Sequence, residues 1–317
     1  KTKDRYWAFI KCDVAGKGVP AALIMVGVAT IFSTEFQYWK PADGIHLDTI
    51  TYRINDFIEK RGFKGRFAAF LMGVYDAKTG KTYICHAGDK FIHIYKQATQ
   101  SVIKQELPNA PTAGTFSNDL VETTAPFKQI VLQLEPGDVL LLYTDGFEES
   151  SRKRRDKNYT ILKEDRIMRD KDGKESIHVE ELVEQLEEHR ITELVQAIKS
   201  RGQYTLRKQD DPLGDAMTYD FDFSSFSGSP EELVMGLAAV EKVFRMMPDP
   251  RASKEDTIIV DAKIDAILER SFKQYKQFCS IKQPHLDPNR KEYLYYGRMR
   301  EDEQFDDLTM MIIQRNS

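Results

Sequence analysis

The segment FIKCDVAGKGVPAALIM, from Phe9 to Met25, constrains the fold of this chain more than any other stretch. An apolar run typical of a β-strand delivers one carboxylate, Asp13, near its end. The Gly16–Gly18 corner that follows can turn sharply because glycine has no Cβ, and an apolar stretch with a proline in its first helical turn comes next. The segment therefore predicts a strand, a tight turn and a helix in direct succession, with an acid at the turn.

The spacing of apolar residues predicts how the rest of the frame is built. The helix that begins at Val19 is apolar on nearly every side as far as Trp39, which predicts burial. The next helix carries an apolar stripe from Leu47 to Ile58 at the helical period. From Phe70 the period changes to two, which predicts paired antiparallel strands. The predicted strands span residues 6–14, 70–74, 81–88, 90–96, 130–134, 139–144 and 308–314.

Residues 151–303 have a different character. Three stretches there show helical patterns, and one of them opens with Ser229, Pro230 and Glu232, a combination typical of a capping box. Polar, turn-rich connectors separate the three stretches. We therefore predict an α+β chain, in which a β-rich frame carries a long, mainly helical insertion at residues 151–303, before the last strand.

The composition excludes several classes of protein. The 317 residues are 41% apolar and 30% charged with a net charge of -4, which fits a globular chain and gives no basic field for nucleic acid. The cysteines, Cys12, Cys85 and Cys279, are too few and too scattered for a disulfide framework or a zinc site. The longest apolar run, 19–32, is too short to span a bilayer. We interpret the basic run 151–157 as a solvated loop, with a docking strip for an acidic phosphoprotein, or a weaker nucleic-acid contact, as alternatives.

Three acidic corners share one format, in which a carboxylate stands where an apolar strand begins or ends. They are Asp13, Asp145 in LLLYTDGFEES, and Asp306–Asp307 in FDDLTMMII. Converging carboxylates raise one another's pKa unless a divalent ion neutralises them, and oxygen ligands favour Mg²⁺ or Mn²⁺ over zinc. Each corner alone would be interpreted as structural, because turn aspartates also bind local backbone donors. Together they predict a catalytic metal site formed by Asp13, Asp145 and Asp306.

Four motifs in order resemble one known family. DVAGKGVPAALIM, FLMGVYDAKTGKTYICHAGDKF, LEPGDVLLLYTDGFEES and DDLTMMII are similar to the motifs of the SpoIIE/RsbU-type branch of the metal-dependent PPM (PP2C-like) protein phosphatases. The resemblance covers Tyr6 to about Ser150 and about Glu303 to Gln314. It implies a PP2C-like antiparallel β-sandwich flanked by helices. Residues 1–317 would form a single PPM-type phosphatase domain, with residues 151–303 inserted into it.

The resemblance also implies a chemistry, the hydrolysis of phosphoserine or phosphothreonine with two Mn²⁺ or Mg²⁺ ions. By position, Asp13 resembles the acid that bridges both ions, and the backbone carbonyl of Val14 resembles a ligand to one of them. Asp145 and Asp306 resemble ligands to the second ion. Three residues are expected beside the ligands rather than among them: Asp307, Gly16 and Lys17. We interpret Lys17 as a solvated turn residue, with a point charge for a substrate phosphate as the alternative.

The sequence departs from the family pattern in three places. The family has an earlier acidic motif, G-G-D-x-x-D, and this sequence opens on Lys1 too late to contain it, so we expect an N-terminally truncated domain with an incomplete metal site. Where the family has A-G-H, this chain has Ala87-Gly88-Asp89, which puts a substrate-binding role of that loop in question. The stretch between YTDG and DDLT is also far longer than the family norm.

From the resemblance we expect a metal-dependent protein serine/threonine phosphatase in bacterial signalling, acting on a phosphorylated anti-sigma-factor antagonist of the STAS type. A homodimer is one option for its assembly, and no nucleic-acid partner is expected. The expected location is the cytoplasm, with any membrane anchor in the missing N-terminal region. The alternative is a catalytically impaired module of the same fold that binds partners through its helical insertion.

Overall fold

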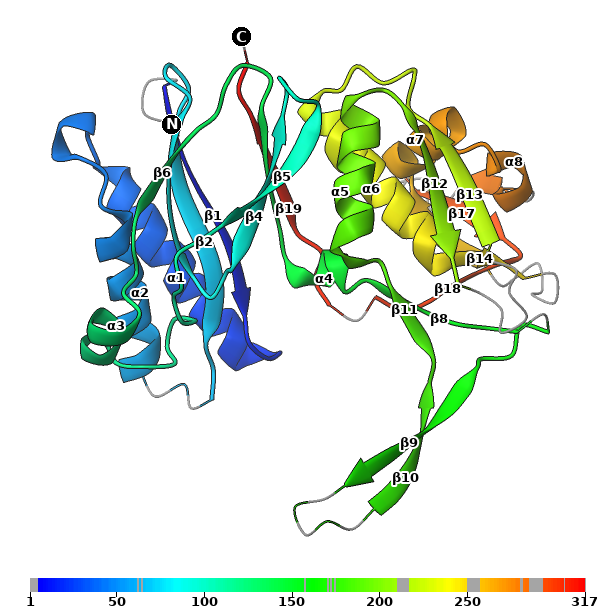
Figure 1. Cartoon of the computed structure of the whole chain (residues 1–317), viewed down its shortest axis with the longest axis horizontal. Coiled ribbons are helices and arrows are strands. Elements are labelled where there is room, and N and C mark those ends of the chain that lie inside the picture. The colour runs from blue at the N-terminus through cyan, green and yellow to red at the C-terminus, as the bar shows by residue number, and fades with distance from the viewer. Residues whose placement is uncertain are drawn as a thin grey trace. The chain divides into compact units, whose positions relative to one another are not determined.

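The computed structural model divides the chain into two compact units (Figure 1). The first unit comprises Lys1–Thr144 and Thr309–Ser317, and the second comprises Asp145–Leu308. The structure describes residues 5–61, 63, 65–156, 158–169, 171, 173, 175–209, 217–249, 257–279, 282–284, 293–304 and 306–316. The second unit is thus a long excursion of the chain between two neighbouring strands of the first.

The first unit is built on two four-stranded antiparallel sheets. One sheet has the order β1-β2-β3-β6, formed by Tyr6–Val14, Ala68–Asp76, Lys81–Ala87 and Ile130–Gln133. The other has the order β19-β7-β4-β5, formed by Met310–Gln314, Val139–Tyr143, Phe91–Lys96 and Ser101–Glu106. The last strand of the chain therefore pairs with β7, although the whole second unit separates them in sequence.

Two apolar cores hold the layers of the first unit together. The core between the sheets takes side chains from both of them: Phe9, Leu71, Tyr75, Ile84, Ile92, Ile94, Leu107, Leu134, Leu140 and Leu142. The second core, which we call the helix-side core, lies between the other face of the first sheet and three helices. These are α1 (Val19–Gln37), α2 (Leu47–Lys60) and α3 (Asn118–Thr124), and a short 3₁₀ turn lies at Pro41–Asp43. The predicted α+β class, with antiparallel sheets stacked face to face and helices outside, is confirmed.

Helix α1 is less buried than its sequence predicts. Only Ala21, Ile24 and Val28 are buried, whereas Leu23 and Val26 are 56% and 63% exposed. The difference arises because the helix packs on one sheet and on α2, which cover one side of it. By length and composition alone the 19-residue helix could also cross a membrane, although the 19–32 run on its own was predicted to be too short.

The second unit combines helices and strands. Helices α6 (Pro230–Arg245) and α7 (Ala262–Ser271) lie in two of the predicted helical stretches, and Ser229 caps α6 by accepting a hydrogen bond from the Glu232 backbone, as predicted. The third prediction, a helix over residues 178–199, is correct only from Glu187 to Lys199 (α5), because the residues before it form strands. Short strands accompany them, so this unit is mixed rather than mainly helical, and it extends beyond the predicted limits of 151–303. Each of these strands has three to seven residues, too few for periodicity to distinguish it from a loop. The remaining elements are α4 (Asp145–Glu148), β8 (Ser151–Lys153), β11 (Val183–Gln185), β12 (Gln203–Lys208), β13 (Met217–Asp222), β14 (Met246–Pro248), β15 (Thr257–Asp261), α8 (Tyr275–Phe278), β16 (Lys282–Pro284), β17 (Tyr293–Gly297) and β18 (Met299–Glu301).

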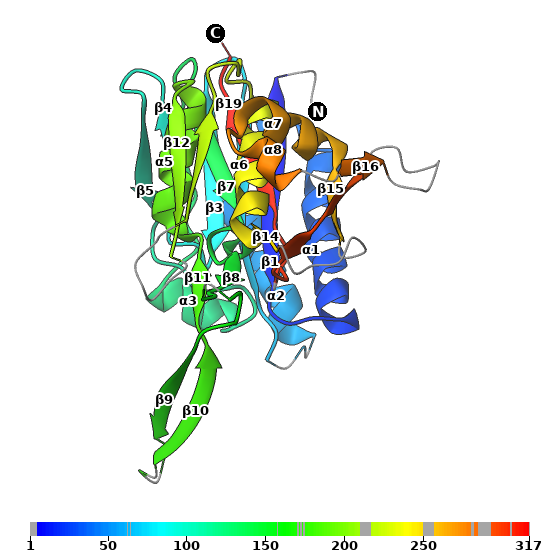
Figure 2. The same ribbon diagram turned by 90° about the vertical axis from the view of Figure 1, so that its right-hand side faces the viewer.

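A two-stranded hairpin extends away from the rest of the second unit, as Figures 1 and 2 both show. Its strands are β9 (Lys163–Arg169) and β10 (Glu175–Glu181), paired antiparallel over seven residues each. We call these two strands the arm. Apart from the half-buried Glu180, every residue of the arm is exposed.

We expect the core between the sheets to determine the stability of the first unit. Leu71 is fully buried there, so Leu71→Ala should lower the free energy of unfolding by about 2–5 kcal/mol, through lost apolar burial and the cavity left behind. Both tryptophans of the chain, Trp7 and Trp39, belong to the first unit, so tryptophan fluorescence during urea unfolding follows this unit. Val131→Ala on β6 is the control, because that side chain is 53% exposed. Equal midpoints for the two variants would contradict the assignment of this core.

Candidate metal centre

Asp13 stands next to the end of β1, on the face of the strand that looks toward the second sheet. Side chains alternate along a strand, so Asp13 shares its face with Phe9, which packs in the core between the sheets. Cys12 faces the other way and packs against the helix-side core. Burial is the main cause that raises the pKa of the Cys12 thiol to about 12. The strand thus holds the Asp13 carboxylate at the rim of the sandwich and keeps the thiol away from it.

Asp145 and Asp306 stand at the ends of two paired strands. The Thr144 backbone N–H donates to the Thr309 carbonyl at 3.0 Å, and the Thr309 N–H donates to Thr144 Oγ1 at 3.1 Å. Asp145 follows Thr144 directly, and Asp306 precedes Thr309 by three residues. The hydrogen bonds between the ends of β7 and β19 therefore bring both acids to the same place.

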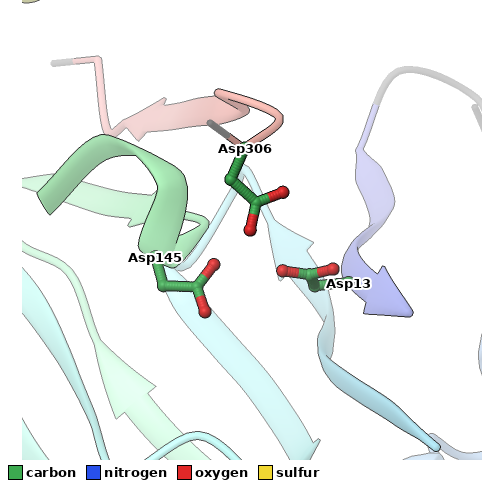
Figure 3. Close-up of side chains that lie close together, drawn as sticks. All are labelled: Asp13, Asp145 and Asp306. Atoms are coloured by element: carbon green, nitrogen blue, oxygen red, sulfur yellow. The ribbon is translucent and has the colours of Figure 1, made fainter. Parts of the chain in front are cut away.

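The three carboxylates converge, as Figure 3 shows. One carboxylate oxygen from each of Asp13, Asp145 and Asp306 lies within 4.8 Å of the other two. Three negative charges at this separation repel one another in the absence of a cation. A group of oxygen donors alone suits a hard divalent ion such as Mg²⁺ or Mn²⁺, so these residues fit the predicted kind of metal.

The other residues predicted at the site lie around this group. Val14 ends β1 with its side chain buried in the helix-side core, so the backbone carbonyl is the atom it could offer to an ion. Asp307 is exposed, and its backbone N–H donates to Asp306 Oδ1 at 2.8 Å, which orients the carboxylate of Asp306. Gly16 and Lys17 are exposed in the turn that follows β1. The roles assigned to these residues from the sequence stay predictions.

The turn after Asp13 is braced by an arginine that the sequence did not reveal. Arg66 Nη1 donates to the Ala15 carbonyl at 2.9 Å, and the Ala15 N–H donates to the Phe67 carbonyl at 2.9 Å. Gly16 has a φ of 90°, and a Cβ there would lie 1.1 Å from Arg66 Nη1. The glycine is therefore required twice, once for its backbone angle and once for the guanidinium beside it.

An ion pair beneath the acids connects the two sheets. Lys11 Nζ on β1 donates to Asp89 Oδ1 at 2.7 Å and to the carbonyl of Tyr143, the last residue of β7, at 3.2 Å. The side chains of Lys11 and Asp89 are 12% and 17% exposed. Asp89, where the family pattern has histidine, is therefore the partner of a lysine that lies two residues before Asp13 on the same strand face. Lys11 and Asp89 are far apart in the sequence, so no local sequence pattern predicts that they pair.

Glu149 is a further acid near the group. Its backbone N–H donates to the Asp145 carbonyl at 2.8 Å, so one helical turn carries it back toward Asp145. Burial, together with the negative charges of Asp145 and Asp306, raises the pKa of the Glu149 carboxyl. Its position four residues after Asp145 in TDGFEES is the sequence signal that could have identified it.

Comparisons with known proteins point to one family. The family model of Stage II sporulation protein E (SpoIIE) matches residues 3–205. No curated protein matches the chain.

Among solved structures, the RsbU and RsbW domains of a Mycobacterium tuberculosis protein are 22% identical, with 47% of this chain and 38% of that chain covered and a TM-score of 0.37. RsbX in complex with magnesium is 15% identical, with 46% and 64% covered and a TM-score of 0.35. The PP2C phosphatase domain of SpoIIE from Bacillus subtilis is 18% identical, with 46% and 39% covered and a TM-score of 0.35. In all three cases the chain spans less than two thirds of the solved structure's length.

We expect the ion pair of Lys11 and Asp89 to stabilise the first unit. Asp89→Asn keeps the shape of the side chain but leaves a mostly buried ammonium without its carboxylate, which should lower the free energy of unfolding by about 1–3 kcal/mol. Urea unfolding followed by tryptophan fluorescence measures this change.

The matched control for this prediction is Asp56→Asn. It removes an exposed partner of Lys60 on α2, a pair of the kind that adds little to stability, and should leave the midpoint nearly unchanged. If both variants unfold at the midpoint of the unmodified chain, the pair beneath the acids has no structural role.

Proposed function

The chain belongs to the SpoIIE family, and from this premise we propose that it is a metal-dependent protein serine/threonine phosphatase that acts in bacterial signalling. The observation that carries the proposal is the convergence of one carboxylate oxygen each from Asp13, Asp145 and Asp306 within 4.8 Å. The three residues come from distant parts of the sequence, and each stands where a strand of the sandwich begins or ends. Such a group is expected of a hydrolase that works through divalent ions.

We propose that these carboxylates hold two Mn²⁺ or Mg²⁺ ions. Asp13 would contact both, with the Val14 carbonyl as a further ligand to one of them, and Asp145 and Asp306 would bind the second. When bound, ions of this kind stabilise the charge that develops on a phosphoryl group under attack and make water a better nucleophile. The all-oxygen donor set supports this choice of metal.

The residues of the chain fix the ligands before any substrate arrives. The pairing of Thr144 with Thr309 holds the ends of β7 and β19 together, and Arg66 braces the turn after Asp13. Asp145 and Asp306 are exposed, and so is the glycine turn, so a phosphorylated side chain on another protein can approach the acids from solvent. Lys17 in that turn is exposed as well, which fits a solvated turn residue and keeps a point charge for the incoming phosphate as the alternative.

For the substrate we propose a phosphorylated anti-sigma-factor antagonist of the STAS type, and for the location the cytoplasm. Both rest on the resemblance of the motifs to the SpoIIE/RsbU-type branch. We further propose that both units belong to a single phosphatase domain, with the second unit inserted between β7 and β19. The rival function is a catalytically impaired module that binds partners through the second unit, and the replacement of the family histidine by Asp89 is the observation that favours it.

We expect Asp145→Asn to remove the activity without unfolding the chain. The amide keeps an oxygen to accept the 3.0 Å hydrogen bond from the Gly146 N–H but loses the charge that a divalent ion requires. Hydrolysis of p-nitrophenyl phosphate with Mn²⁺ should fall at least about tenfold, and the affinity for Mn²⁺ in a calorimetric titration should fall by a similar factor.

Asp119→Asn is the matched control, because it removes an exposed aspartate of α3 in the first unit. Unchanged Mn²⁺ affinity in Asp145→Asn would contradict the metal site. A chain that binds Mn²⁺ through these acids yet shows no turnover would support the binding module instead.

A further inference from the structure

The arm presents one apolar face and one polar face, and this division follows from its pairing. Ile167 stands opposite Ile177, and Asp165 stands opposite Val179, so these side chains share one face of the ribbon. The other face carries Arg166, paired with Glu180 at 3.0 Å, and Met168 opposite Ser176. The arm is therefore amphipathic, although nothing in the described part of the chain covers its apolar side.

The apolar side chains of the arm are strongly exposed and lie next to one another. Ile167, Ile177 and Val179 are 63%, 69% and 63% exposed, and they adjoin one another in the register. A two-stranded ribbon in water is marginally stable unless one face packs on something. Contiguous exposed apolar side chains on a projecting element are typical of an interaction surface.

The charges on the same face indicate what covers it. Toward the tip lie Arg169 and Glu175, joined at 2.8 Å, and toward the base lie Asp165 and then Lys163, which stands opposite Glu181 in the register. If two arms pack face to face about a two-fold axis through the Ile167–Ile177 pair, the tip of each lies against the base of the other. Arg169 of one copy then lies opposite the Asp165 of its partner, twice by symmetry.

From this self-complementarity we propose that the arm is a dimerisation element, which packs its Ile167–Ile177–Val179 face against the same face of a second copy of this chain. An isologous contact needs a surface that complements itself, and on β9 the opposite charges of Asp165 and Arg169 are equally spaced about Ile167. The face is small, so the dimer is reversible and depends on concentration. This inference does not rest on the proposed phosphatase activity.

Charge reversal tests the proposal through a pair of variants. Arg169→Asp sets two aspartates against each other at both ends of the contact, and Asp165→Arg sets two arginines against each other. Each variant alone should weaken self-association about tenfold or more, measured by sedimentation equilibrium over a range of protein concentrations. An equimolar mixture should dimerise as strongly as the unmodified chain, because the heterodimer restores an opposite pair at both positions.

The control is Arg166→Asp, which removes an exposed cross-strand arginine from the polar face and should leave the dimer unchanged. A chain that stays monomeric at every concentration would overturn the proposal. So would dimers that all the variants form as strongly as the unmodified chain, since another surface would then hold them. Single variants that are weakened but are not restored by mixing would overturn the face-to-face geometry.

Discussion

The mutual repulsion of three carboxylates is the constraint on which the arrangement of β1, β7 and β19 depends. Asp13, Asp145 and Asp306 have oxygens within 4.8 Å of one another, and such a group opposes the fold that creates it unless a cation is present. The fold overcomes this cost by fixing Asp13 on β1 and by placing Asp145 and Asp306 beside the paired ends of β7 and β19. Asp13 stands on β1, whose other residues pair with β2 along its whole length, and Asp145 follows a strand paired with both β4 and β19.

The same constraint gives a physical account of Lys11 and Asp89. An ammonium at Lys11 lies on the strand face that carries Asp13 and offsets part of the negative charge above it. Buried without a partner, that ammonium would itself be costly, and Asp89 provides the partner. In this chain, Asp89 therefore serves as the partner of a lysine on β1. The hydrogen bond from Lys11 to the Tyr143 carbonyl extends this coupling to the strand that delivers Asp145.

The features that the sequence predicts correctly are those that neighbouring residues encode, whereas contacts between distant residues are missed. Strand β1 matches its predicted limits, and β7 and β4 each differ from theirs by one residue, because their apolar residues are contiguous or alternate over many positions. Strand β5 and helix α3 were not predicted: the first is a half-exposed edge strand, and the second has seven residues. The three acids could be named from their strand-end format, but their convergence depends on β19 pairing with β7 across the second unit. Arg66 contacts Ala15 and Asp89 contacts Lys11, and no local sequence pattern predicts contacts between residues so far apart in the chain.

The two segments that join the second unit to the first are tied to each other by hydrogen bonds at two places, which we call closures. In the first unit, Thr144 pairs with Thr309. At the second, Asp302 accepts hydrogen bonds from the Lys153 N–H at 2.8 Å and from Arg155 Nη1 at 2.9 Å. Burial alone would raise the pKa of the Asp302 carboxyl, yet the hydrogen bonds from Arg155 and Lys153 lower it. The Asp302 carboxylate is therefore charged at neutral pH.

The stretches of sequence between these two closures are short, and they carry Asp145, Glu149 and Asp306. Each segment is pinned at both ends, so its acids keep their place without a core of their own. An insertion that joined the frame through long, independent loops would leave the same acids free to separate under their own repulsion. The closures at Thr309 and Asp302 therefore explain how Asp145 and Asp306, which the second unit separates widely in sequence, are held close to each other.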